Sequence, residues 1–237
     1  MSEWKQKRFW TKVDVAEVDD GFTVHLDGRG VKTPAKAALT VPTMALASAV
    51  AAEWDAQIGV VNPNLMPFTR SANAAIDKVR IQHSEVADML AAYGDADLLC
   101  YRATDPIELV TRQAEEWDPV LAWARVELDA PLEIRSGVMH APQAEIPLLG
   151  LSVKTHALTD FELAAFHDLV SLSGSLILGF AAARGFAPIQ ELWLKSRLDE
   201  HWQEEQWGPD EEAQLASEVK KESFLHAKRF FDASQLS

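Results

Sequence analysis

The sequence predicts an α+β fold, in which a small β-rich N-terminal domain with one packed helix precedes an α-helical C-terminal domain. Two observations carry this prediction. Alternating apolar residues and Asp-Gly turns fill the first thirty residues, which is typical of antiparallel strands. Farther along, apolar residues recur at helical spacing almost to the end of the chain. We therefore expect one domain at residues 1–80 and a second at residues 81–237.

Two strands are expected before residue 30. The first lies within residues 8–18, and its inward positions are expected to be Phe9, Val13, Val15 and Val18. The second places Phe22, Val24 and Leu26 on one face and ends in a turn at Asp27-Gly28.

The first predicted helix runs from about Thr43 to Gln57. Thr43 is a suitable N-cap, because its hydroxyl can accept from a free N–H of the first turn. The alanine-rich face of this helix suits close packing on a sheet. Trp54 follows that face among Glu53 and Asp55, so it is expected to pack in the core, or, if exposed, to mark a docking site.

The remaining predicted helices follow the 3.6-residue period. One starts at Pro106, passes Pro119 and carries apolar contacts at Leu109, Trp117, Leu121 and Trp123. The others are expected near residues 144–156, 160–172, 174–184, 188–207 and 210–233. The longest apolar stretch, Ser175 to Phe186, is too short to cross a membrane and predicts a buried helix.

Composition disfavours several classes of protein. The net charge of −14 over 237 residues disfavours nucleic acid and anionic membranes as partners. The charge is uneven, since residues 1–12 carry four cations and one acid, whereas residues 199–212 carry seven acids and no cation. This asymmetry favours a partner with a basic or polar patch. No apolar segment follows the basic N-terminal residues, so no secretory signal is expected. A mitochondrial presequence is not expected either, because it would be longer, richer in arginine and poor in acids, which Glu3 and Trp4 fit badly.

The motifs of small-molecule and metal chemistry are not found. Gly174 and Gly179 have the spacing of a phosphate-binding loop, but Phe180 and Ala181 replace its lysine and hydroxyl residue, so both glycines are expected to serve helix packing. The seven histidines form no zinc-binding pattern, and Cys100 is expected to be a buried, inert thiol. We expect no catalytic residue, cofactor, metal or small-molecule substrate.

The acidic stretch after residue 188 invites a different interpretation. On one helix, Glu200 shares a stripe with Trp193, Ser196, Gln203 and Trp207. A carboxylate buried there would need a partner, such as Arg102 or Arg184. The alternative is that Glu200 is a polar spot within an aromatic contact surface, and the residues alone leave both possibilities open.

Several motifs occur together in a distinctive order. They are "KRFW" (7–10), "GFTVHLDGRGVKTP" (21–34), "LTVP" (39–42) with "LASAVAAEWDAQ" (46–57), "MPFT" (66–69), "AID" (75–77), "DLLCYR" (97–102), "RQAEEWDPVLAW" (112–123) and "SRLDEHWQEEQWG" (196–208). Together they closely resemble the ATP synthase assembly chaperone family that handles the α subunit of the catalytic head. The resemblance runs from about Lys7 to Gly208 and is weak between Leu128 and Asp160.

The resemblance implies a chaperone without enzymatic activity. Its members bind the unassembled α subunit of the F-type ATP synthase, mask the surface that later meets the β subunit, and use no ATP. It implies a bacterial cytoplasmic location here and the mitochondrial matrix for eukaryotic relatives. It also favours Glu200 as a client contact, supported by Asp199, Gln203 and Trp207, with Trp54 as a packing or binding residue.

Two other functions stay open from the residues alone. One is a hydrolase that uses the acidic pair Asp199 and Glu200 as acid and base. The other is an interaction module with an unrelated client.

Overall fold

The computed structural model describes residues 7–137 and 139–235, so part of the basic N-terminal segment, residues 1–6, lies outside the described residues. The chain divides into two compact units. The first contains the described parts of residues 1–83, 159–165 and 229–237, and the second contains residues 84–158 and 166–228. The predicted domain division at residues 80 and 81 stays a prediction.

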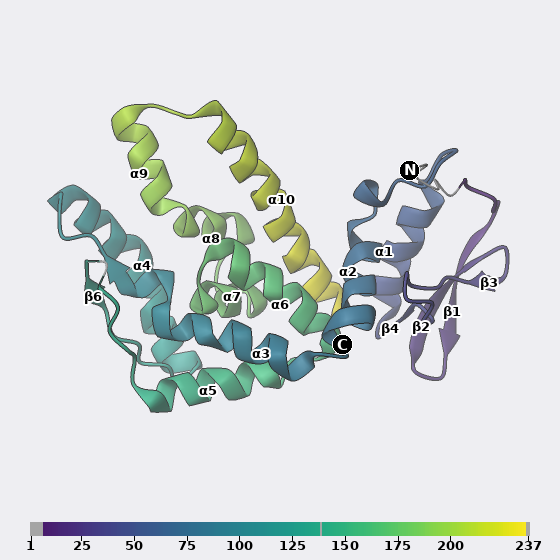
Figure 1. Ribbon diagram of the computed structural model, residues 1–237, viewed down its shortest axis with the longest axis horizontal. Helices are drawn as coiled ribbons and strands as arrows, with labels where there is room; N and C mark the ends of the chain where they lie inside the picture. Colours follow the sequence, from purple (N-terminus) through teal and green to yellow (C-terminus); the bar gives the residue numbers. More distant parts are fainter. Residues whose placement is uncertain (1–6, 138, 236–237) are drawn as a thin grey trace. The chain divides into compact units, whose positions relative to one another are not determined.

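The first unit is built on a small antiparallel sheet with helices beside it (Figure 1). Its strands are β1 (Val13–Val18), β2 (Gly21–Leu26), β3 (Arg29–Gly30) and β4 (Thr40–Val41). Its helical elements are α1 (Met44–Asp55), the 3-10 turn η1 (Pro63–Leu65), α2 (Pro67–Ala74) and the π turn η2 (Ala75–Val79). β2 is the central strand, because β1, β3 and β4 all pair with it.

The β1–β2 hairpin confirms the second predicted strand and corrects the first. Val24 and Leu26 are buried as expected, and Val15 lies opposite Val24 in the pairing register. β1 begins only at Val13, however, and Phe9 is 57% exposed. The prediction of Phe9 and Val18 as inward positions was wrong. Phe9 precedes the strand, and Val18 lies on the face opposite to Val13 and Val15, because successive side chains of a strand alternate.

Helix α1 begins where the sequence predicts. The Thr43 hydroxyl accepts a hydrogen bond from the Leu46 N–H at 3.1 Å, so Thr43 is the N-cap. Leu46, Ala47 and Val50 form the buried face. At the far end, the Glu53 carboxylate accepts from the N–H groups of Phe68 and Thr69 in the first turn of α2. Burial raises the pKa of Glu53 despite these hydrogen bonds.

The second unit is helical, as predicted, apart from one short pair of strands. Its elements are α3 (His83–Ala91, of which His83 belongs to the first unit), η3 (Ala92–Ala96), η4 (Leu98–Cys100), β5 (Tyr101–Arg102), α4 (Ile107–Glu127), β6 (Arg135–Ser136), α5 (Glu145–His156), α7 (Leu176–Ala183), α8 (Ile189–Ser196) and α9 (Leu198–Trp207). Helices α6 (Asp160–Ser173) and α10 (Glu211–Ser234) contribute residues to both units. No helix in residues 7–137 and 139–235 is long and apolar enough to cross a bilayer.

Helix α7 is the centre of the helical core, as its apolar sequence predicts. Every residue from Leu176 to Ala182 is buried. The fully buried carboxylate of Asp97 lies at its N-terminus, where it accepts from the Ser175 hydroxyl at 2.7 Å and from the Ile177 N–H at 3.0 Å. The same carboxylate accepts from the Leu99 N–H at 3.0 Å, so Asp97 joins the turn before β5 to the start of α7. Burial raises the pKa of Asp97 to about 6.

The two glycines with phosphate-loop spacing have different structural roles. A Cβ on Gly179 would lie 2.6 Å from a methyl carbon of Val170 and 3.3 Å from the ring of Phe166, so this glycine allows α7 to pack closely on α6. Gly174 does not serve packing, and that prediction was wrong. Its φ of +74° and its N–H, which donates to the Val170 carbonyl at 2.8 Å, end α6 instead.

Alanine substitutions at two helical glycines should have opposite effects on stability. Gly179→Ala is expected to lower the free energy of unfolding by about 1–3 kcal/mol, because its methyl group overpacks the α6–α7 contact. Gly150→Ala in α5 is expected to raise it by up to about 1 kcal/mol, because nothing lies within 4 Å of the added methyl group and alanine favours the helix. Denaturant unfolding of both variants tests the pair. Stabilisation by Gly179→Ala would contradict close packing at this contact.

Candidate partner-binding surface

The predicted single helix over residues 188–207 is in fact two helices. α8 ends at Ser196, and Arg197, with φ −111° and ψ 17°, leaves the helical conformation before α9 starts at Leu198. The break divides the stripe that the sequence placed on one helix. Leu192, Trp193 and Ser196 of α8 are buried, whereas α9 buries only Leu198.

Trp193 is a core residue at this bend. Its ring packs on Phe224 of α10 with centroids 5.5 Å apart, and the guanidinium of Arg197 lies 5.2 Å from its ring centroid. The bend thus holds Arg197 against an aromatic face, from which the guanidinium can reach the first turn of α9.

Glu200 lies on the exposed part of α9. Its carboxylate forms an ion pair with Arg197 at 2.9 Å, and its side chain is 54% exposed. The internal partners considered from sequence are engaged elsewhere, and that pairing was wrong. Arg102 forms an ion pair with Asp118 at 2.8 Å, and Arg184 donates to the Glu127 carbonyl. Glu200 is therefore a surface carboxylate held by a local pair.

The other predicted contact residues of α9 differ in their surroundings. Asp199 accepts a hydrogen bond from the Gln113 side chain of α4 at 2.7 Å, so it is turned toward that helix. Gln203 is exposed, and Trp207, at the last position of α9, is 80% exposed. An indole so open to water has little packing role within the chain and is available to a partner.

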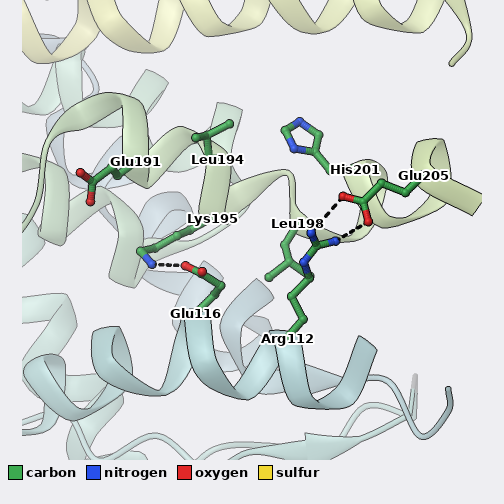
Figure 2. A pocket seen from close by; sticks show the side chains of 8 residues that line it. All are labelled: Arg112, Glu116, Glu191, Leu194, Lys195, Leu198, His201 and Glu205. Atoms are coloured by element: carbon green, nitrogen blue, oxygen red, sulfur yellow. Dashed lines mark hydrogen bonds and ion pairs between the residues drawn. The ribbon is translucent and has the colours of Figure 1, made fainter. Parts of the chain in front are cut away.

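Two ion pairs that the sequence did not predict attach this region to α4. The Arg112 guanidinium donates to both carboxylate oxygens of Glu205, at 2.8 and 2.9 Å, and Lys195 pairs with Glu116 (Figure 2). The hydrogen bonds from Arg112 hold the pKa of Glu205 below its usual range. The paired residues lie 93 and 79 positions apart, so no local sequence pattern predicts these pairs.

These ion pairs border a first hollow, between α4 and the α8–α9 bend. It has a volume of about 350 Å³, and Figure 2 shows the side chains that line it. They are Arg112, Glu116, Glu191, Leu194, Lys195, Leu198, His201 and Glu205.

A second hollow lies between the α8–α9 bend and the N-terminal half of α10. Its volume is about 840 Å³, and its lining includes Arg197, Glu200 and Glu204 on one side and Ser217 and Lys221 on the other. Leu194 and His201 line both hollows. The bend at Arg197 is thus flanked by concave surface on two sides.

Trp54 lies in the first unit and is half-buried. Its ring packs on Trp10 with centroids 5.3 Å apart, and Arg8 lies over Trp10 at 5.5 Å. The Arg8 guanidinium also forms an ion pair with Asp55 at 3.1 Å. Trp54 thus packs on Trp10, which precedes β1. The core packing between sheet and helix that the sequence predicted for Trp54, and its contact role, stay predictions.

The groups that could carry covalent or metal chemistry are dispersed. Cys100 is buried as predicted, and burial raises the pKa of its thiol to about 12, which makes it a poor nucleophile. In the part of the chain that the structure describes, no three His, Cys, Asp or Glu side chains are placed to hold a metal ion. The acidic pair Asp199 and Glu200 has separate partners, Gln113 and Arg197.

Comparison with known proteins agrees with this architecture. A family model described as "ATP12 chaperone protein" matches residues 7–125. The protein named "Protein atp12, mitochondrial" of Schizosaccharomyces pombe is 27% identical over 223 residues, which cover 87% of this chain and 75% of that protein.

Solved structures extend the similarity over nearly the whole chain. The crystal structure of Atp12 from Paracoccus denitrificans is 47% identical, with a TM-score of 0.96, and the match covers 98% of this chain and 100% of the other. A solved protein from Agrobacterium tumefaciens is 43% identical, with a TM-score of 0.89 and coverage of 96% and 85%. These matches confirm the predicted α+β fold and include the α8–α9 region beyond the family model. This chain belongs to the ATP12 chaperone family.

Proposed function

We propose that this chain is an assembly chaperone of the F-type ATP synthase that binds the unassembled α subunit. It covers the surface of α that later meets the β subunit, uses no ATP, and makes or breaks no covalent bond. Membership of the ATP12 chaperone family supports a role in ATP synthase assembly. The motifs shared with the α-handling chaperones support α as the client.

The observation that best supports a binding function is the exposed side of α9. Trp207 is open to water, and Glu200 and Gln203 lie exposed on the same helix. Aromatic side chains supply large contact area at an interface, whereas surrounding carboxylates give specificity and speed of association. We propose that Glu200, Gln203 and Trp207 contact the client, with Asp199 supporting them from the side of α4. Trp54 is a further proposed contact in the first unit.

Release of the client requires only competition. An unassembled subunit exposes apolar surface that drives aggregation, and a chaperone that covers this surface prevents it. Because β buries more of α than the chaperone does in this proposal, β displaces the chaperone without an energy source.

A hydrolase that uses Asp199 and Glu200 is less well supported. General acid–base catalysis by two carboxylates requires both to face one substrate, with the pKa of one raised. Glu200 instead pairs with Arg197 at the surface, and Asp199 accepts from Gln113. We propose a contact role for this pair.

The proposed function is tested with purified α subunit. We expect light scattering by aggregating α to fall in the presence of an equimolar amount of this protein, and β to release the chaperone from the α complex. Equally fast aggregation of α with and without the protein would refute the proposal. Pull-down from a bacterial extract distinguishes an unrelated client, because the α subunit should be the main protein recovered.

We also propose a bacterial cytoplasmic location. The two solved relatives above 40% identity come from bacteria, whereas the more distant Schizosaccharomyces pombe relative is named as mitochondrial. Fractionation of the source cells tests this point.

A further inference from the structure

The two hollows beside the α8–α9 bend form one continuous surface. Leu194 and His201 line both of them, so a segment that crosses this ridge touches both hollows at once. Leu194 is 52% exposed, although leucine is apolar and its neighbours Leu192 and Trp193 are buried. The ridge therefore offers an apolar contact that the chain itself leaves uncovered.

Most charges that line the hollows are already neutralised. In the first hollow, Arg112 pairs with Glu205 and Lys195 pairs with Glu116. In the second, the pairs are Arg197–Glu200 and Lys221–Glu218. These four pairs leave no net charge to select a partner.

The remaining lining charges are mainly negative. Glu191 in the first hollow and Glu204 and Glu211 in the second form no ion pair with another described residue. Lys220, which lines the second hollow, is a cation that likewise forms no ion pair with another described residue. Three unpaired carboxylates against one ammonium give the surface a net negative charge on both sides of Leu194. An apolar centre between unpaired carboxylates is complementary to an apolar side chain flanked by cations.

The shape favours a polypeptide over a small molecule. Small-molecule pockets enclose most of the ligand, whereas both hollows here are about half open to solvent and are bordered by many charged side chains. The first hollow, about 350 Å³, has room for one large side chain, and the larger second hollow can take adjoining residues.

We propose that the ridge of Leu194 and His201, with its two hollows, binds a basic amphipathic segment of the α subunit. An apolar side chain of that segment contacts Leu194, and Lys or Arg residues on either side pair with Glu191 and Glu204. This inference rests on the proposed function, and it extends the client surface from α9 to α8 and to the start of α10.

The apolar contact is tested with a matched pair of leucines. Leu194→Gln removes apolar surface from the ridge, and Leu149→Gln removes it from α5, where Leu149 is 56% exposed. We expect Leu194→Gln to raise the Kd for immobilised α subunit about five- to tenfold and Leu149→Gln to leave it unchanged. Both residues are exposed, so neither change should unfold the protein.

The charge contacts are tested with two double variants that change the net charge equally, by four charges each. The double variant Glu191→Lys/Glu204→Lys reverses the two carboxylates of the surface, whereas Glu115→Lys/Glu222→Lys reverses two exposed carboxylates that line neither hollow. We expect the first variant to associate with α about tenfold more slowly at low salt, with a smaller difference at high salt. The second should keep most of the wild-type rate.

The outcomes separate the two proposals. If the wild-type protein ignores the α subunit, the proposed function fails, and this inference fails with it. If the wild type binds α, and the ridge variants bind no differently from their controls, the surface is not the docking site although the chaperone function stands. Self-association of the wild-type protein that Leu194→Gln abolishes would assign the ridge to a second copy of the chain and overturn the proposal.

Discussion

Replacing Asp97 by asparagine is expected to lower the free energy of unfolding by about 2–3 kcal/mol. Every hydrogen bond found at this carboxylate is one that it accepts, from Leu99, Ser175 and Ile177. The asparagine amide keeps the shape but turns one acceptor atom into a donor, so a buried N–H or O–H loses its partner. Thermal unfolding followed by circular dichroism should show a midpoint about 5–10 °C lower.

A matched control separates this effect from the loss of a charge. Glu115→Gln makes the same carboxyl-to-amide change at an exposed position of α4 and should leave the midpoint within about 2 °C. A stability of Asp97→Asn equal to that of the wild type would mean that the donors around Asp97 have other acceptors.

The pKa of Asp97 adds a dependence on pH. Burial raises its pKa from 3.8 to about 6, so between these values the folded protein binds more protons than the unfolded chain. The stability that this group contributes is fully present below pH 3.8 and is lost as the pH rises through 6. The loss in the free energy of unfolding amounts to up to about 3 kcal/mol. The difference in stability between the wild type and Asp97→Asn should therefore be larger at pH 5 than at pH 7.5. Denaturant titrations at both values measure it, and a difference that grows with pH would contradict the raised pKa.

Local sequence patterns predicted the elements whose determinants are local. The Asp19-Asp20-Gly21 turn and the alternation of Phe22, Val24 and Leu26 specify the β1–β2 hairpin. Gly21 is required there, because a Cβ would lie 2.4 Å from the carbonyl oxygen of Val41 on β4. Thr43 fixes the start of α1, since a side-chain cap needs only residues within one turn.

The break at Arg197 could not be predicted in this way. Ser196, Arg197 and Leu198 include no glycine or proline, so nothing local ends a helix there. In the structure, the Trp117 indole donates to the Lys195 carbonyl at 2.9 Å. An unbroken helix would use this oxygen as the acceptor for the N–H of Asp199. A contact between residues 78 positions apart thus accompanies the break. The break in turn divides the predicted stripe that placed Trp193 beside Glu200.

The candidate surface was predictable only in part for the same reason. The seven acids between residues 199 and 212 mark α9 in the sequence. The pair Arg112–Glu205 joins residues 93 positions apart, and the ridge of Leu194 and His201 depends on the bend. Residue composition therefore pointed to the helix, whereas long-range packing determines which of its carboxylates are neutralised.

Reversing the charge of Glu200 is expected to weaken binding of the α subunit at least tenfold while the fold stays intact. Glu200→Lys places an ammonium beside Arg197 on the face that we propose meets the client, so a neutral ion pair becomes two adjacent cations that repel a basic client segment. The local cost is small, because a surface ion pair three residues apart on a helix contributes about 0.5 kcal/mol or less. The binding constant for the α subunit, measured at two salt concentrations, tests the loss of affinity. The thermal midpoint of the free chaperone tests whether the fold stays intact.

Two further variants show what Glu200 contributes. Glu200→Gln removes the charge without reversing it and should fall between the wild type and Glu200→Lys in affinity, with a weaker dependence on salt. Glu115→Lys, which reverses an exposed carboxylate on α4, should bind α like the wild type. Unfolding of Glu200→Lys would identify the pair with Arg197 as structural. Unchanged binding of the α subunit by a folded Glu200→Lys would instead show that Glu200 lies outside the client surface. A residue in contact with a basic segment of α could not change from an anion to a cation without weakening that contact.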